Sequence, residues 1–184
     1  MRNCSKFNEE FKDLWGRDWD PDRFNWEEDS YVLVVDFSEY FDCWWDPDRF
    51  EWDRFSHWLA KHCSQHFLKW WDPNKFRWEA SDFLAKYCHQ YFDIWWNPDL
   101  FDWWSGSYAL AEYCNKHFDK WWDPHRFDWL SAKALALYCS EHFHKWWNPK
   151  KFKFTTNIRA LFKGCRRFKH HWYPAIKTTL LSCC

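Results

Sequence analysis

A four-residue motif, Trp-Trp-Asx-Pro, recurs along most of this sequence at a nearly constant interval. The seven prolines follow one another at spacings of 26, 26, 25, 26, 25 and 25 residues. A fixed period of this length is typical of repeat proteins, in which each repeat is one supersecondary element packed on its neighbours. The complete copies begin at Trp44, Trp70, Trp95, Trp121 and Trp146, and weaker copies are Trp19-Asp20-Pro21 and Trp172-Tyr173-Pro174.

Within each repeat the residue pattern predicts two helices. An Asx residue followed by proline is a strong helix start, and Phe and Trp three and five residues later indicate a short first helix. A Leu lies fourteen residues before the next proline in most repeats. Counted from this Leu, apolar residues follow at positions 0, 3, 4, 8, 11 and 12 and form a stripe along one helix face, which predicts a longer second helix ending at the Trp pair. Both Trp residues of each pair are therefore predicted to be core. The expected N-caps of the second helices are Ser56, Ser81, Ser105, Ser131 and Thr156.

The expected fold is all-α, a short α-solenoid of ~25-residue helix-turn-helix repeats, each with a short and a long helix. Residues 1–18 are predicted to form a leader or cap helix, residues 19–174 about six repeats, and residues 175–184 a tail. The segment 31–35 has a strand-like composition, but its register predicts helix. Two positions of the second helix are named here by their distance from the next proline: the Cys column lies ten residues before it, and the Phe column lies six residues before it. In the divergent last repeat, counting back from Pro174 places Gly164 in the Cys column and Phe168 in the Phe column.

Charge is divided unevenly although the net charge is only −1. Residues 1–141 hold all 27 Asp and Glu and 16 Lys and Arg, a net of −11, whereas residues 142–184 hold 10 Lys and Arg and no acid. A basic end on an acidic body predicts an anionic partner at that end.

The candidate binding residues form two groups. Arg159, Lys163 and Arg166 share one face of a predicted helix, and with Arg167 and Lys169 they could bind phosphates or dock an acidic protein surface. Arg126 and Lys151 belong to a basic column two residues after the prolines, which is predicted to face solvent. The acidic N-terminal repeats of a second copy are another possible occupant, giving head-to-tail association.

The nine cysteines recur mainly at the repeat period. Because the N-terminus lacks the apolar core of a secretory signal, reduced thiols and a cytoplasmic location are expected. Three Cys-x-x-His pairs resemble half of a zinc set, but repeats stacked about 10 Å apart are too distant to share a tetrahedral site, so no metal or cofactor is expected. The pairs are Cys63/His66, Cys114/His117 and Cys139/His142, and the terminal Cys183-Cys184 resembles the prenylated end of some small GTPases.

Catalytic and membrane signatures are not found in the sequence. It contains no nucleophile elbow and no His-Glu-x-x-His motif, and its 3 glycines do not build a phosphate-binding loop. No apolar run approaches the ~18 residues of a membrane span. The sequence therefore favours a non-enzymatic scaffold that binds a macromolecule, foremost a protein. Nucleic-acid binding at the basic end and a Cys/His metal array are the alternatives.

The Trp-Trp-Asx-Pro repeats, followed by Phe and Trp, resemble uncharacterised aromatic tandem-repeat proteins of large viruses and phages. The resemblance covers roughly residues 19–174 and implies a host-interaction factor inside a host cell, with no catalytic residue carried over. The helical pair per repeat also resembles ankyrin and tetratricopeptide repeats. Because their sequence signatures are missing, that likeness concerns architecture alone.

Overall fold

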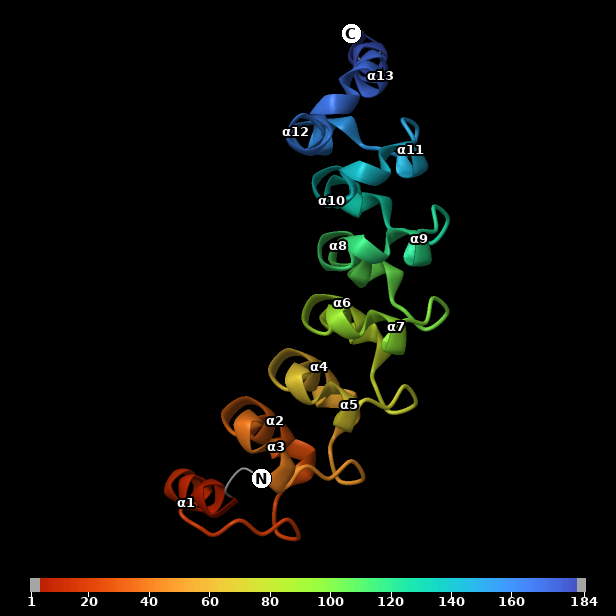
Figure 1. Cartoon of the computed structure of the whole chain (residues 1–184). Helices are drawn as coiled ribbons and strands as arrows, with labels where there is room; N and C mark the ends of the chain where they lie inside the picture. The colour runs from red at the N-terminus through yellow and green to blue at the C-terminus, as the bar shows by residue number, and fades with distance from the viewer. Residues whose placement is uncertain (1–3, 182–184) are drawn as a thin grey trace. The chain divides into compact units, whose positions relative to one another are not determined.

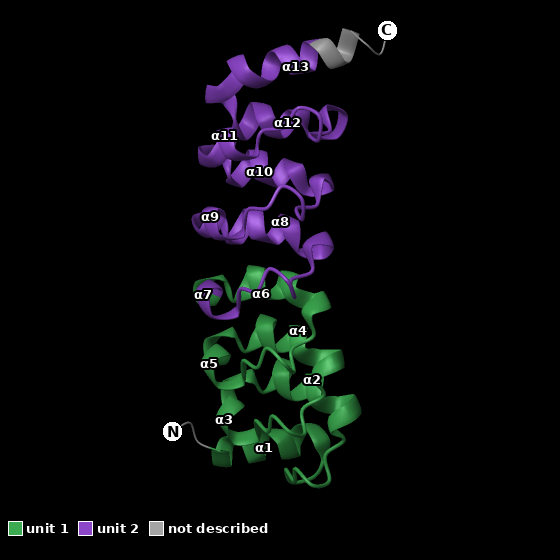
Figure 2. Ribbon diagram, turned by 90° about the vertical axis from the view of Figure 1, so that its right-hand side faces the viewer, with its two compact units in different colours: residues 1–91 green, residues 92–184 purple. Residues whose placement is uncertain are grey.

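The computed structural model describes residues 4–181, and every regular element in that range is helical. The chain divides into two compact units, residues 1–91 and 92–184, which are described separately (Figure 2). In unit 1 the helix α4 packs against α2 and α6, and in unit 2 the helix α10 packs against α8 and α12 (Figure 1). Successive long helices are thus neighbours within each unit, which confirms the predicted all-α repeat fold.

Unit 1 contains a leading helix and the first repeats. Long helices, 3-10 helices (η) and one-turn helices alternate along it. The bounds are α1 Cys4–Trp15, α2 Trp26–Asp36, η1 Ser38–Tyr40, α3 Phe41–Trp44, α4 Trp52–His62, η2 Ser64–His66, α5 Phe67–Trp70, η3 Trp78–Ala80, α6 Ser81–Tyr87 and η4 His89–Tyr91. The helix α2 includes the strand-like segment 31–35, so the prediction from register is correct there.

Unit 2 repeats the same order of elements and ends in a longer helix. The bounds are α7 Phe92–Trp95, α8 Trp103–Tyr113, η5 Asn115–His117, α9 Phe118–Trp121, η6 Trp129–Ser131, α10 Ala132–Tyr138, η7 Ser140–His142, α11 Phe143–Trp146, α12 Phe154–Gly164, η8 Arg166–Phe168 and α13 Lys169–Leu181. Residues assigned to a tail therefore continue α13 as far as Leu181, and Ile176 is buried. Cys183 and Cys184 lie outside the described residues.

The Asx-Pro motif begins a single turn rather than the predicted short helix. The Asp46 side chain accepts a hydrogen bond from the Asp48 backbone N–H at 3.0 Å, and the Asp46 carbonyl accepts from Phe50. The next residue, Glu51, is extended and precedes the first residue of α4. The chain leaves the turn there because Phe50 is already buried and Trp52 starts the next helix. An Asx side chain satisfies such a turn as well as it satisfies a helix start.

The predicted second helix is interrupted at the Cys column. The Cys63 backbone leaves helical geometry, and its carbonyl accepts the His66 N–H at 2.9 Å and the Trp70 indole N–H at 2.8 Å. The same indole bond joins Trp121 to Cys114 and Trp146 to Cys139. Periodicity does not reveal this break, because the residues on either side stay on one apolar face.

Of the predicted serine and threonine N-caps, only Ser131 occupies a cap position, before α10, and its side chain makes no capping hydrogen bond. The helices α2, α4, α8 and α12 begin at the aromatic residue five positions after proline, whereas α6 and α10 follow a 3-10 turn that begins there. Where a side chain caps a long helix it is that of the preceding residue, such as Asp102. Ser56 and Ser81 are fully buried inside the helical stretch instead. Ser107 donates to the Trp103 carbonyl at 2.6 Å and accepts the Asp128 N–H of the next repeat at 2.9 Å. A buried hydroxyl thus connects successive repeats.

The core includes four columns of almost fully buried residues. The residue in each column comes from the same position of successive repeats. The Leu, Cys and Phe columns and the first Trp of each pair are at most 3% exposed in the complete repeats. The second Trp, for example Trp122, is only half-buried, so the prediction that both Trp residues are core is wrong for this column. The Leu column is Leu33, Leu59, Leu84, Leu110, Leu135 and Leu161, and the first-Trp column is Trp44, Trp70, Trp95, Trp121 and Trp146.

A stack of rings forms each joint between neighbouring repeats within a unit. In unit 1, His66 stacks on Phe41 at 4.7 Å and Tyr91 stacks on Phe67 at 4.6 Å. In unit 2 the same stacks are His117 on Phe92, His142 on Phe118 and Phe168 on Phe143, at 4.5, 4.3 and 4.6 Å. The second Trp covers the other face of its own Phe, as Trp122 does at 5.2 Å from Phe118. Its burial on one side and exposure on the other follow from this place in the stack.

The register of the last repeat differs from the prediction by one residue. Cys165 is fully buried, and its carbonyl accepts the Trp172 indole N–H at 2.9 Å, so Cys165 and not Gly164 occupies the Cys column. Phe168 consequently takes the position that holds His or Tyr in other repeats, and Lys169 takes the Phe column. Because the Asx residue is missing before Pro174, the chain makes no turn there, and Pro174 lies inside α13.

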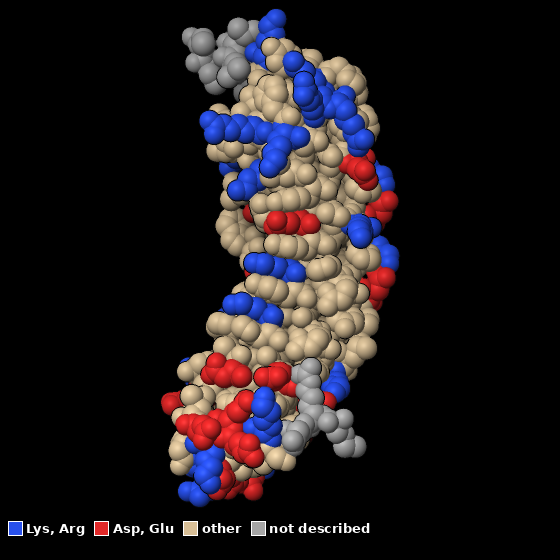
Figure 3. Space-filling model, turned by 60° about the vertical axis from the view of Figure 1, so that its left-hand side comes forward, with Lys and Arg blue, Asp and Glu red and all other residues tan. Residues whose placement is uncertain are grey.

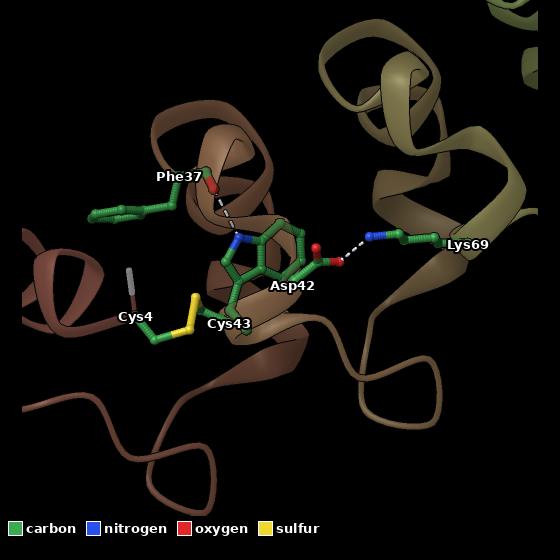
Figure 4. The surroundings of a disulfide bond; sticks show 6 residues. Cys4, Phe37, Asp42, Cys43 and Lys69 are labelled. Atoms are coloured by element: carbon green, nitrogen blue, oxygen red, sulfur yellow. Dashed lines mark hydrogen bonds and ion pairs between the residues drawn. A yellow bond between two sulfur atoms is a disulfide. The ribbon is translucent and has the colours of Figure 1, made fainter. Parts of the chain in front are cut away.

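The leading helix α1 is attached to unit 1 by a disulfide between Cys4 and Cys43 (Figure 4). The rings of its buried Phe7 and Phe11 pack against that of Phe37, with ring centres 5.3 and 5.8 Å apart. The expectation that all thiols are reduced is therefore wrong for these two cysteines. Neither belongs to the periodic Cys column, so the repeat period carried no information about their pairing.

Candidate partner-binding surface

The terminal part of unit 2 carries a dense group of cations. Arg159 and Lys163 lie one turn apart on α12, Arg166 and Arg167 lie on η8, and Lys169 begins α13. All five side chains are exposed, and none forms an ion pair within residues 4–181. Figure 3 shows Lys and Arg gathered over this end of unit 2. The five residues are called the basic end here. Because α12 ends at Gly164, Arg166 does not continue the helix face of Arg159 and Lys163, so the prediction that all three share one helix face is wrong.

Aromatic rings lie beside these cations. The Arg167 guanidinium lies 4.8 Å from the Phe168 ring centre, and the Lys169 ammonium lies 5.1 Å from that of Tyr173. Phe162 and Tyr173 are each about half exposed. Cations over aromatic faces are held in place while they stay accessible to an anion. The surface therefore offers positive charge and apolar contact together.

Arg126 and Lys151 have a different role from the one predicted. Both belong to Asx-Pro turns and not to the basic end. Arg126 donates to the Pro98 carbonyl at 2.5 Å and pairs with Asp99 at 2.7 Å, both in the preceding repeat. Lys151 donates to the Pro124 carbonyl at 2.8 Å. In unit 1, Arg49 and Lys75 make the same contacts with the preceding turn. The basic column therefore ties neighbouring repeats together.

The Cys and His residues of the candidate zinc pairs are separated by their packing. The Cys139 thiol donates to the Ala111 carbonyl at 3.4 Å, while His142 stacks on Phe118. Burial raises the pKa of each thiol in the column to about 12, which holds these cysteines in the protonated, weakly nucleophilic form. Within residues 4–181, no cluster of three or more His, Cys, Asp or Glu is arranged to hold a metal ion.

A histidine cluster beside the basic end was only partly visible in the sequence. His170 and His171 follow Lys169, and the His144 ring of the preceding repeat lies 5.0 Å from that of His171. All three side chains are exposed. The pKa of His171 is lowered by burial and by the neighbouring His170 and His144. The signal for His144 was its place in a column that holds Asp42, Asp93 and Asp119 in other repeats.

Comparisons of the chain with protein-family models, characterised proteins and solved structures gave no match. Among the helices described between residues 4 and 181, none has the length and apolar character needed to cross a membrane. A function for this chain is therefore inferred from the chemistry of the surfaces described above.

Proposed function

We propose that this chain is a non-enzymatic helical repeat scaffold whose basic end binds an acidic surface of a protein partner. The observation that carries the proposal is the absence of any acid in residues 142–184, beside five exposed cations that form no ion pair within the described residues. Other lysines of the two units pair with Asp residues across the joints between repeats, as Lys69 does with Asp42 and Lys145 with Asp119. Unbalanced like charge destabilises a fold by self-repulsion, and an anionic partner would remove that cost.

A second candidate function is binding of single-stranded nucleic acid at the same surface. Exposed Tyr173 beside Lys169 supports it, because aromatic rings stack bases while cations bind phosphates. A protein partner is preferred because exposed Phe162 also lies on α12, so apolar contact is offered from two helices beside the charge. An intracellular location is also part of the proposal, and a role in a host cell is a further part that follows from the resemblance alone.

The test compares binding of two probes, an oligoglutamate peptide and a single-stranded oligonucleotide of equal charge, by fluorescence anisotropy at several salt concentrations. The variant Arg159→Glu/Lys163→Glu/Arg166→Glu reverses three cations of the basic end. Its matched control, Lys61→Glu/Lys116→Glu/Lys133→Glu, makes the same change in net charge at exposed lysines of other repeats. We expect the first variant to weaken oligoglutamate binding more than about tenfold and the control to weaken it about twofold or less.

Salt dependence separates the possible results. Binding to exposed charges weakens as salt rises, because charges are screened beyond about 8 Å at physiological ionic strength. Equal loss of binding in both variants would show that net charge alone attracts the probe, and the proposal would be withdrawn. Tight oligonucleotide binding without oligoglutamate binding would assign the surface to nucleic acid.

A further inference from the structure

An ion pair crosses three of the joints between neighbouring repeats within the two units, and the last joint of unit 2 holds other residues at the same positions. The Asp residue directly after the Phe column of one repeat pairs with the Lys residue two positions after the Phe column of the next repeat. In unit 1, Lys69 pairs with Asp42 at 2.5 Å (Figure 4). In unit 2, Lys120 pairs with Asp93 at 2.6 Å, and Lys145 pairs with Asp119 at 2.5 Å. In the joint between the last two repeats, the same two positions hold His144 and His171.

At these two positions the last joint therefore has imidazole rings and no carboxylate. The rings of His144 and His171 lie 5.0 Å apart at 87°, and His170 lies 4.1 Å from His171. In the two preceding joints a histidine also lies near the Asp, since His117 Nδ1 is 3.9 Å from Asp93 and His142 Nδ1 is 4.0 Å from Asp119. In these two joints of unit 2, the Asp carboxylate therefore lies between a Lys ammonium and a His imidazole.

The other charged groups around the histidines are mainly cationic. On α11, Lys145 already pairs with Asp119 of the preceding repeat. On η8 and α13 the neighbours are Arg166, Arg167 and Lys169. The nearest acid in the sequence is Glu141 of η7, which lies in the preceding repeat and pairs with none of the three histidines in the described residues.

We propose that His144, His170 and His171 form a proton-dependent anion site, which binds carboxylates of an acidic protein segment in place of the Asp that this joint lacks. The inference rests on the proposed function and adds its regulation: the histidines supply extra positive charge beside the basic end only when they are protonated. A bound carboxylate stabilises the imidazolium form, so binding takes up protons by linkage.

The direction of the pH dependence follows from the charge of the ring, because only a protonated imidazole attracts a carboxylate, and a bound carboxylate in turn favours the protonated form. The pKa of His171 is lowered in the free chain, so the gain in binding is expected on the acidic side of neutral pH. Glutamate side chains stay ionised at about pH 8 and at about pH 6. Each exposed imidazolium–carboxylate pair strengthens binding about two- to fivefold, so the cluster is expected to tighten binding about tenfold between pH 8 and pH 6.

The experiment is titration calorimetry of the full chain with an oligoglutamate peptide at pH 8 and pH 6 and constant ionic strength. Buffers with different ionisation enthalpies report the protons taken up on binding. The test variant is His144→Gln/His171→Gln, and the matched control is His125→Gln, an exposed histidine of a turn in unit 2. We expect the test variant to bind like wild type at pH 8 and to lose the gain and the proton uptake at pH 6. The control should keep both.

The contrary results identify which proposal fails. Binding that is equally tight at both pH values, or a gain that survives in His144→Gln/His171→Gln, overturns the histidine site and leaves the proposed function intact. No oligoglutamate binding at either pH overturns both. A gain seen with a single-stranded oligonucleotide and not with oligoglutamate overturns the choice of carboxylate and assigns the site to phosphate.

Discussion

Replacing the two members of one Trp pair tests the assignment of the core. Trp121 is 1% exposed, and its indole donates to the Cys114 carbonyl at 2.9 Å. Removing a buried Trp side chain costs about 3–5 kcal/mol of unfolding free energy. The Cys114 carbonyl keeps its bond from His117, so losing the indole bond adds only about 1 kcal/mol. We therefore expect Trp121→Ala to lower the free energy of unfolding by about 4–6 kcal/mol.

The half-buried partner gives the comparison. Trp122 stacks on Phe118 with one face and is partly exposed on the other. Trp122→Ala should cost about 2–3 kcal/mol, from partial burial and a ring pair worth about 1 kcal/mol. Trp104, which is 72% exposed in α8, is the matched control, and Trp104→Ala should change stability by about 0.5 kcal/mol or less.

Urea unfolding followed by circular dichroism measures these differences through the transition midpoint and slope. If Trp121→Ala does not fold, Trp121→Phe keeps most of the ring volume and should lose about 2 kcal/mol. A loss at Trp122 equal to that at Trp121 would refute the division into a core column and a half-exposed column. A large loss at Trp104 would refute the exposure itself.

Three further predictions concern the joints, the thiols and the disulfide. Gly164→Ala should cost about 2 kcal/mol or more in urea unfolding, because the added Cβ would overlap the Ala136 carbonyl of the neighbouring helix. Native thiols of the Cys column should not label faster as pH rises from 7 to about 10, as followed by mass spectrometry. Since folding raises their pKa from 9.0 to about 12, their contribution to stability is present below about pH 9 and lost as pH rises toward 12. Reduction of Cys4–Cys43, which closes a span of 39 residues, should lower the melting temperature by an amount worth about 2–4 kcal/mol, and Cys43→Ser should make that temperature insensitive to reductant.

The sequence predicted the fold class and the buried columns because both depend on periodicity. Leu33 was placed in a helix by its register although its neighbours favour a strand, and the structure confirms it. Details that depend on hydrogen bonding between backbone and side chain were not predictable in this way. The break at Cys63 requires an indole seven residues later to bind a carbonyl, and periodicity is the same with or without it.

The basic end was visible in the sequence because charge is counted directly. The partners of Arg126 were not, because its contacts with Pro98 and Asp99 join residues 28 and 27 positions apart across a joint. The register of the last repeat failed for a related reason. Pro174 served as the reference for counting, and the missing Asx residue had moved it by one position. Counting from Leu161 places Cys165 and Trp172 correctly.

The ring stacks also bear on how such an array can grow in evolution. Each joint uses a Phe from one repeat and a His, Tyr or Phe from the next. A duplicated internal repeat therefore brings both rings that it needs, one to stack on the repeat before it and one to be stacked on by the repeat after it. Lys169 in the Phe column interrupts this rule at the C-terminal side, since an added repeat would meet a flexible cation there instead of a ring. New copies are therefore accommodated within the array and not after its last repeat, and the number of repeats can change while the basic end is inherited unaltered.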